Sequence, residues 1–388
     1  MNKKLLSIVV PTKNRYKYLE SFVELLASYE DERMEMVIQD NSDDNQEFLK
    51  YLKEKDYDFI IYNYCSEHLS IIENSDRAIK ASNGKYVCFM GDDDLVLKDL
   101  CSFVELMDKN KVDSAFFRQA KYSWPGVRYK VHDIPNLDIP WFEGKLELKS
   151  VKGELKRLLK NGAISMESMP QLYHGVILRK RLEEIYKATG TYFPGPSPDM
   201  AVAVALSKFV KKHVVCDVPY TVAGTAPKSG GGMGANHEHK GEIKYAVWLP
   251  EDTEEKWEER LPKIWTGPTI YAESAIKAMR AIGIGEKERF FNYYSNYAYM
   301  LVFCPGYTKL VRQQLKGDML GKIIVFLKVI QFFIKRAIVF SKNIMKFKWG
   351  ITKDIINRNV STSFQAGEII NDMISERKII VEKLFEQL

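Results

Sequence analysis

The sequence lacks several features that would assign it quickly to a class of proteins. Its five cysteines form no C-x-x-C pair, so neither a disulfide framework nor a structural zinc site is indicated. It contains no run of about 18 uncharged apolar residues of the kind that crosses a membrane. The apolar run Leu5–Val10 ends at Pro11 and is too short for a signal peptide. We therefore expect a cytoplasmic protein with free thiols.

Several motifs of nucleotide and hydrolytic enzymes are also missing. No G-x-x-x-x-G-K-[ST] loop is present, and no G-x-G-x-x-G follows the first apolar segment. The sequence has no G-x-S-x-G elbow and no H-E-x-x-H pair. These absences argue against P-loop NTPases, dinucleotide-binding enzymes, serine hydrolases and zinc peptidases. A nucleotidyltransferase is disfavoured too, because no glycine-rich basic loop follows the first strand.

Acidic residues are missing from one long segment, Met319 to Lys353, which carries eight basic residues. Since the whole chain has a net charge of +6, the rest of it is slightly acidic, at +6 − 8 = −2. The basic charge is therefore local, and we do not expect a nucleic-acid-binding protein. At 46% hydrophobic and 28% charged residues, the composition is that of a folded protein.

The first half of the sequence alternates between strand-like and helical patterns. Short, almost wholly apolar segments alternate with segments of helical periodicity, which predicts a mostly parallel α/β sheet covered on both faces. In such sheets the ligand lies at the carboxyl ends of the strands. The predicted strands cover residues 6–10, 34–38, 59–62, 86–90 and 114–117.

Carboxylates gather after two of these strands. Asp40 follows the second strand, and Asp92, Asp93 and Asp94 follow the fourth. Three adjacent carboxylates repel one another unless a cation relieves them, and Mg²⁺ or Mn²⁺ prefers oxygen ligands and commonly bridges to phosphates. A nucleotide diphosphate is thus the expected partner. An acidic N-terminal cap of the next helix is the alternative explanation for Asp94.

Three segments together carry a family resemblance: SIVVPTKNR, VIQDNSDD and NGKYVCFMGDDD, in this order and at the strand ends. They resemble the N-terminal half of family 2 glycosyltransferases, which have the GT-A fold and an Asp-x-Asp signature. The resemblance covers roughly residues 5–225. It implies an inverting, metal-dependent transferase that uses a nucleotide diphosphate sugar.

The resemblance also implies roles for individual residues. Asp40 would accept the N3–H of uracil, which favours a UDP-sugar, although Gln39 stands where the family usually has another acid. Asp94 is the best candidate for the metal, with Asp92 beside it. The residues implied in donor binding are Pro11, Thr12, Arg15, Asp40, Asn74, Arg77, Asp92 and Asp93.

The acceptor side of the expected site is marked less clearly. Asp199 opens a predicted helix where the GT-A fold places its general base, and an acceptor hydroxyl must lose its proton as it attacks. Pro198 replaces the usual Glu, and a capping aspartate is the alternative. His174 and Gly175 resemble the family's acceptor loop, in which the backbone approaches the sugar closely. His237 and His239 follow a glycine-rich loop and would add a metal ligand, or be a solvated surface pair.

The segment 319–353 projects as an amphipathic helix. Most of its lysines fall within roughly 60° of one another, and isoleucines and phenylalanines occupy the opposite side. This arrangement favours a helix lying at the inner face of the cell membrane, with its lysines toward anionic headgroups. Packing of the helix on the catalytic domain or on a second copy of the chain is the alternative.

Together these patterns predict a GT-A catalytic domain over residues 1–225, with a donor side (1–117) and an acceptor side (118–225). A flexible loop (226–250) and a helical C-terminal region (251–388) follow. The predicted function is transfer of a sugar to a hydroxyl of a glycan or lipid-linked acceptor in cell-surface polysaccharide synthesis. A membrane-docking scaffold with a degenerate transferase domain is the alternative, supported by Gln39 and Pro198.

Overall fold

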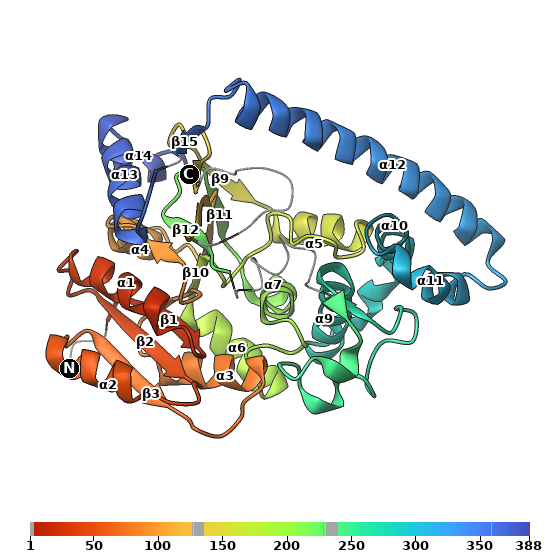
Figure 1. Cartoon of the computed structure of the whole chain (residues 1–388), viewed down its shortest axis with the longest axis horizontal. Helices are drawn as coiled ribbons and strands as arrows, with labels where there is room; N and C mark the ends of the chain where they lie inside the picture. The colour runs from red at the N-terminus through yellow and green to blue at the C-terminus, as the bar shows by residue number, and fades with distance from the viewer. Residues whose placement is uncertain (1–3, 126, 128–135, 228, 230–239, 358) are drawn as a thin grey trace.

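The computed structural model describes residues 4–125, 127, 136–227, 229, 240–357 and 359–388 (Figure 1). Its N-terminal part alternates between strands and helices as far as β4, as the hydrophobic pattern predicts, and the short strand β5 follows β4 directly. The elements of this part are β1 (Leu6–Thr12), α1 (Tyr16–Ala27), β2 (Met34–Asp40), α2 (Gln46–Lys55), β3 (Ile60–Tyr64), α3 (Ile71–Ala81), β4 (Tyr86–Phe89), β5 (Leu95–Val96) and α4 (Leu100–Lys109).

A mixed sheet forms the centre of the molecule. Among the described residues it has eight strands in the order β3-β2-β1-β4-β10-β6-β11-β9. The strands from β3 to β4 are parallel, and β10 and β9 run against their neighbours. Its later strands are β6 (Ser114–Phe117), β9 (Leu146–Lys149), β10 (Gly175–Leu178) and β11 (His213–Cys216). The predicted α/β class, with its mostly parallel sheet, is confirmed.

Both faces of this sheet are covered. Successive side chains of a strand point to opposite faces, and in β1 the side chains of Ile8 and Val10 join one hydrophobic cluster while Val9 joins the other. The first cluster lies under α1, α2 and α4, and the second is shared with α5, α6, α7 and α9. The helices of the second group are α5 (Val151–Lys160), α6 (Arg179–Thr189), α7 (Pro198–Phe209) and α9 (Gly267–Ala281).

A smaller sheet lies beyond the strand ends, in the order β15-β8-β7-β12-β5. It brings a late strand, β12, against the segment that follows β4. Its other strands are β7 (Ala120–Ser123), β8 (Leu137–Ile139), β12 (Thr221–Thr225) and β15 (Ile355–Asn357), and a separate pair is formed by β13 (Lys240–Gly241) and β14 (Trp265–Thr266). Short 3-10 turns cover Ile243–Tyr245, Glu251–Thr253, Gly285–Phe290 and Pro305–Tyr307.

The C-terminal region is helical, as predicted, and its longest helix lies along the outside of the molecule (Figure 1). Only the N-terminal part of α12 packs on the body, where Gly321 and Val325 are buried against α10. Beyond Phe333 its side chains are exposed on every side. No helix among the described residues is long and apolar enough to cross a bilayer. The helices here are α10 (Tyr293–Phe303), α11 (Thr308–Gln314) and α12 (Met319–Asn343).

After α12 the chain returns to the N-terminal half. The ammonium of Lys346 pairs with Asp138 at 2.7 Å and with Asp354 at 3.1 Å, and β15 then pairs with β8. The last two helices, α13 (Ser363–Glu376) and α14 (Val381–Phe385), pack on α1 and α4. The C-terminal residues therefore complete the core under the first helix of the chain.

We predict that Ile370→Ala lowers the free energy of unfolding by about 2–4 kcal/mol, because a fully buried isoleucine of α13 leaves a cavity beside α1. Urea denaturation of the full chain measures the change. Ile380→Ala is the matched control, since that side chain is 43% exposed and its loss should cost well under half as much. Equal losses for the two variants would show that α13 is not part of the core.

Candidate active site

The three carboxylates after β4 form the centre of the site. Asp92, Asp93 and Asp94 are almost completely buried. Because β1 is the parallel neighbour of β4, the loop after β1 reaches them from one side. Thr12 donates a hydrogen bond to Asp92 at 2.7 Å. The Arg15 guanidinium lies 3.1 Å from Asp92 and 2.9 Å from Asp93.

The end of β12 reaches the same carboxylates from another direction. The backbone N–H of Gly224 donates to Asp94 at 2.7 Å, and that of Ala226 donates to Asp93 at 2.8 Å. A Cβ on Gly224 would lie 1.7 Å from the carbonyl oxygen of Asp93, so only glycine allows this approach. The sequence pattern had not indicated a strand here, and the contact depends on the tertiary fold.

Burial makes the negative charge of this cluster costly. It raises the pKa of Asp92 to about 7, although Arg15 opposes the rise and Asp93 adds to it. Burial and the charge of Asp94 also raise the pKa of Asp93, against the effect of Arg15. Three carboxylates thus face one guanidinium, and a further cation would be stabilised among them.

His174 supplies a second positive group. Its Nε2 lies 2.7 Å from a carboxylate oxygen of Asp94. Burial alone would lower the pKa of His174, but the Asp94 carboxylate outweighs burial and raises it. The residue adopts a left-handed backbone conformation, with φ at +60°, which turns the chain between Tyr173 and β10. The structure thus brings His174 to the acidic cluster.

Gly175 starts β10 inside the central sheet. A Cβ there would lie 2.1 Å from the carbonyl oxygen of Gln171 and 2.8 Å from that of Ala115. Sheet packing therefore accounts for this glycine, whereas the sequence suggested a close approach of the backbone to a sugar. A role of Gly175 toward the acceptor stays a prediction.

Asp199 is the second residue of α7, directly after Pro198. Burial raises its pKa to about 6, while His174 lowers the value and Asp94 raises it. His174 and Asp94 therefore both act electrostatically on Asp199. The start of α7 is fixed by α9, because the Ser274 hydroxyl accepts a hydrogen bond from the Ser197 N–H at 2.8 Å. A carboxylate held next to the acidic cluster, with a pKa near neutrality, is suited to accept a proton.

Asp40 is fully buried, and its carboxylate is already occupied. One oxygen accepts hydrogen bonds from the hydroxyls of Tyr16 and Tyr62, both at 2.7 Å. The other oxygen accepts from the N–H of Ser42 at 2.8 Å. Asp40 thus joins the ends of β2 and β3 to the start of α1.

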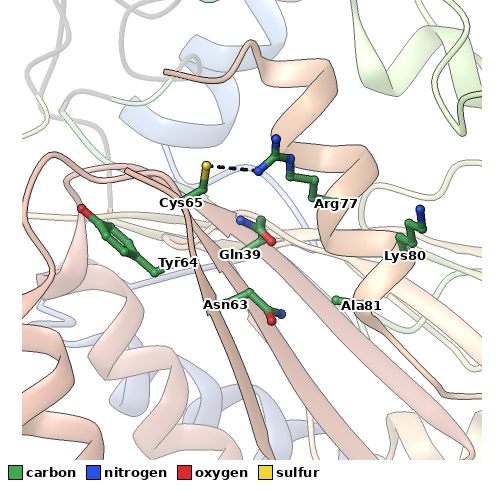
Figure 2. A pocket seen from close by; sticks show the side chains of 7 residues that line it. All are labelled: Gln39, Asn63, Tyr64, Cys65, Arg77, Lys80 and Ala81. Atoms are coloured by element: carbon green, nitrogen blue, oxygen red, sulfur yellow. Dashed lines mark hydrogen bonds between the residues drawn. The ribbon is translucent and has the colours of Figure 1, made fainter. Parts of the chain in front are cut away.

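An open cavity of about 340 Å³ lies on the other face of the same strand ends. Figure 2 shows the side chains of Gln39 and Arg77 at this cavity, with the Arg77 guanidinium 3.1 Å from the sulfur of Cys65. Asn74 lies one turn earlier on α3 and is buried. The cavity is lined by Gln39, Asn63, Tyr64, Cys65, Arg77, Lys80 and Ala81. Of these, the sequence had indicated only Arg77, although the departure at Gln39 was a usable signal.

The negative charge of Asp92, Asp93 and Asp94 suits a divalent cation, but these side chains do not form a complete set of metal ligands. No group of three or more His, Cys, Asp or Glu side chains that could hold a metal occurs in the described part of the chain. His237 and His239 lie outside the described residues. The unbalanced negative charge of the cluster is the feature that favours a cation, and Asp94 and Asp92 are its nearest candidate ligands.

Comparison with known proteins gives one family. The model of "Glycosyl transferase family 2" matches residues 7–167, which contain the ends of β1, β2 and β4. No curated protein matches the chain.

The solved structures that resemble the chain include TarS of S. aureus. TarS 1–349 in complex with UDP shares 16% identity over 57% of this chain and 61% of that one, with a TM-score of 0.42. The complex with UDP-GlcNAc shares 13% identity over 84% of this chain and 79% of that one, with a TM-score of 0.45. The match to a further TarS structure spans 37% of the length of that chain.

Proposed function

We propose that this chain, whose residues 7–167 form a domain of glycosyl transferase family 2, transfers a sugar from a nucleotide diphosphate sugar, with UDP favoured, to a hydroxyl of a glycan or lipid-linked acceptor. The observation that carries the proposal is the buried cluster of Asp92, Asp93 and Asp94, which Thr12, Arg15 and His174 contact; the charges of Asp94 and His174 also act on Asp199. Asp199 would accept a proton from the acceptor, and the three carboxylates would bind the donor. Synthesis of a cell-surface polysaccharide would use this reaction.

The proposed mechanism is a single displacement that inverts the anomeric carbon. Asp199 accepts the proton of the acceptor hydroxyl as its oxygen attacks the sugar. The leaving group is a diphosphate, whose charge is met by Arg15 on the donor side. Thr12 and Arg15 also fix Asp92, so the donor binds to a preformed surface. His174 holds Asp94 in place and lowers the pKa of Asp199.

We predict that Asp199→Asn reduces kcat by about 10² to 10⁴ and leaves the affinity for UDP unchanged, because the amide cannot accept the proton. In the unaltered enzyme only the ionised Asp199 is active. Its pKa of about 6 therefore predicts that activity rises through pH 6 and is level above it. Initial rates across pH measure both effects. Near-normal turnover of the variant would exclude Asp199 as the base.

A divalent cation, Mg²⁺ or Mn²⁺, is part of the proposal. Asp94 and Asp92 would hold it, with His237 or His239 as a further candidate ligand. When bound, it would neutralise charge on the departing diphosphate. We expect a chelator to abolish transfer and added Mn²⁺ or Mg²⁺ to restore it. The same cation should raise the melting temperature only when UDP is present, and full activity in chelator would contradict the metal requirement.

We also propose that α12 attaches the enzyme peripherally to the inner face of the cell membrane. Its free part exposes large apolar side chains, with Phe333 and Ile334 each 56% exposed. Asp318 precedes the helix, and no acid follows until Asp354. Two copies of this helix would bring lysines together without acids to balance them, whereas anionic lipid headgroups balance them.

We predict that replacing Phe333 and Ile334 together by Ser reduces binding to vesicles containing phosphatidylglycerol by about tenfold or more, because each buried apolar side chain contributes about 1.5–3 kcal/mol. Sedimentation with the vesicles measures binding. Tyr245→Ser is the control, since it removes a side chain that is 71% exposed on another part of the surface. If the chain self-associates and does not bind the vesicles, α12 makes a protein contact instead of a membrane contact.

A further inference from the structure

A second cavity lies at the amino end of β4, whereas the three carboxylates follow its carboxyl end. β4 begins at Tyr86, which pairs with Leu178 at the end of β10, and Arg179 follows directly. The cavity is lined by Arg179 and by other residues of α6, the last turn of α3 and the turn before β4 (Figure 1). Its volume of about 360 Å³ is in the range of sites for small molecules.

The guanidinium of Arg179 is held in one orientation at this cavity. Its Nε donates to the carbonyl oxygen of Gly84 at 2.6 Å, and its Nη2 donates to the hydroxyl of Ser82 at 2.7 Å. The side chain is 14% exposed, and its one ion pair within the described chain joins Nη1 to Glu183 at 3.9 Å, beyond hydrogen-bond distance. The arginine is therefore fixed by two of its nitrogens, while Nη1 can still bind a ligand.

The charge around this arginine favours an anion. Burial lowers the pKa of Arg179, and the charges of Glu183 and Glu35 oppose that effect only in part. Glu183 is 48% exposed, and its carboxylate also accepts a hydrogen bond from the hydroxyl of Tyr192 at 3.1 Å. Lys80 adds a second positive charge, so the described lining carries two cations and one acid. An anion in the cavity would be stabilised by this excess of positive charge.

The rest of the lining suits an organic molecule. The rings of Tyr186 and Tyr192 lie with their centroids 4.8 Å apart, and both residues line the cavity together with the amide of Asn83. A phosphate ion alone would leave most of this volume empty. Aromatic side chains with a few polar groups are the usual lining of a site for a small organic ligand. The cavity therefore suits an anion that is carried on a small polar molecule.

We propose that this cavity is a second binding site, separate from the carboxylate cluster, and that it binds a sugar phosphate. Arg179 and Lys80 would bind the phosphate, because hydrogen bonds from charged donors to phosphate are strong. Asn83 and Glu183 would bind sugar hydroxyls, and the ring of Tyr186 would cover one face of the sugar. This site is independent of the proposed transfer reaction, since its ligand would lie at the other end of β4 from the donor.

Titration calorimetry of the full chain with glucose 1-phosphate tests the proposal, with inorganic phosphate and glucose as reference ligands. We expect glucose 1-phosphate to bind about tenfold or more tightly than inorganic phosphate, because the sugar adds hydrogen bonds, and glucose to show no binding. Saturation of the chain with UDP and Mg²⁺ should leave the affinity for glucose 1-phosphate unchanged. Equal affinities for the two phosphates, or no binding of glucose 1-phosphate, would overturn the inference.

Two variants assign the binding to this cavity. Arg179→Gln should weaken glucose 1-phosphate about tenfold or more, because a charge-assisted hydrogen bond is lost. Since Arg179 also holds Gly84, a folding defect could give the same loss. Glu183→Gln should instead strengthen binding about two- to fivefold, as expected for removal of one exposed charge, and a folding defect cannot produce a gain.

Glu184→Gln is the matched control for this gain. Glu184 is the next residue of α6, pairs with Arg181 at 3.0 Å and does not line the cavity, so its loss should leave the affinity unchanged. Equal gains for the two variants would show an effect of net charge and overturn the inference. If UDP displaces glucose 1-phosphate, the sugar phosphate occupies the donor side, so this inference is overturned and the proposed function stands. A chain that binds glucose 1-phosphate as predicted but does not bind UDP would overturn the proposed function alone.

Discussion

The burial of three adjacent carboxylates is the constraint on which the rest of the site depends. Isolated buried charges are too costly to keep without partners, and each partner here comes from a different part of the chain. Thr12 ends β1 and Arg15 follows it, His174 precedes β10, and the N–H groups of Gly224 and Ala226 lie at the end of β12. Both sheets and the loops between them are therefore positioned by one electrostatic requirement.

The charges of these buried carboxylates also affect the protonation of the groups around them. The charge of Asp94 raises the pKa of both His174 and Asp199, and His174 in turn lowers the pKa of Asp199. A ligand that brings phosphates and a cation into this site would change the pKa of all three groups at once. In the proposed mechanism, the protonation of Asp199 would in this way depend on whether the carboxylate cluster is occupied.

Much of this arrangement is visible in the sequence, since apolar strands followed by polar residues predict a parallel sheet and the edge at which its ligand lies. The three aspartates after β4 were identified in that way, and the family resemblance indicated Thr12 and Arg15. The pattern could not show that Asp40 is enclosed by Tyr16 and Tyr62, because the tyrosines lie on different elements. Nor could it show why Gly175 is a glycine: the clash with the carbonyl of Ala115 exists only once β10 lies beside β6. Local periodicity sets the elements, while the contacts between distant elements decide what each side chain can still bind.

The return of the C-terminal helices to α1 has a consequence for how the protein is made. Ile370 and Phe385 belong to the same hydrophobic cluster as Leu25 and Phe103, so contacts that span almost the whole chain close the core next to the helix that begins at Tyr16. During synthesis the N-terminal half emerges first and must wait with part of its apolar surface uncovered. Such long-range closure slows folding, and a nascent chain would bind a chaperone at this surface until α13 has left the ribosome.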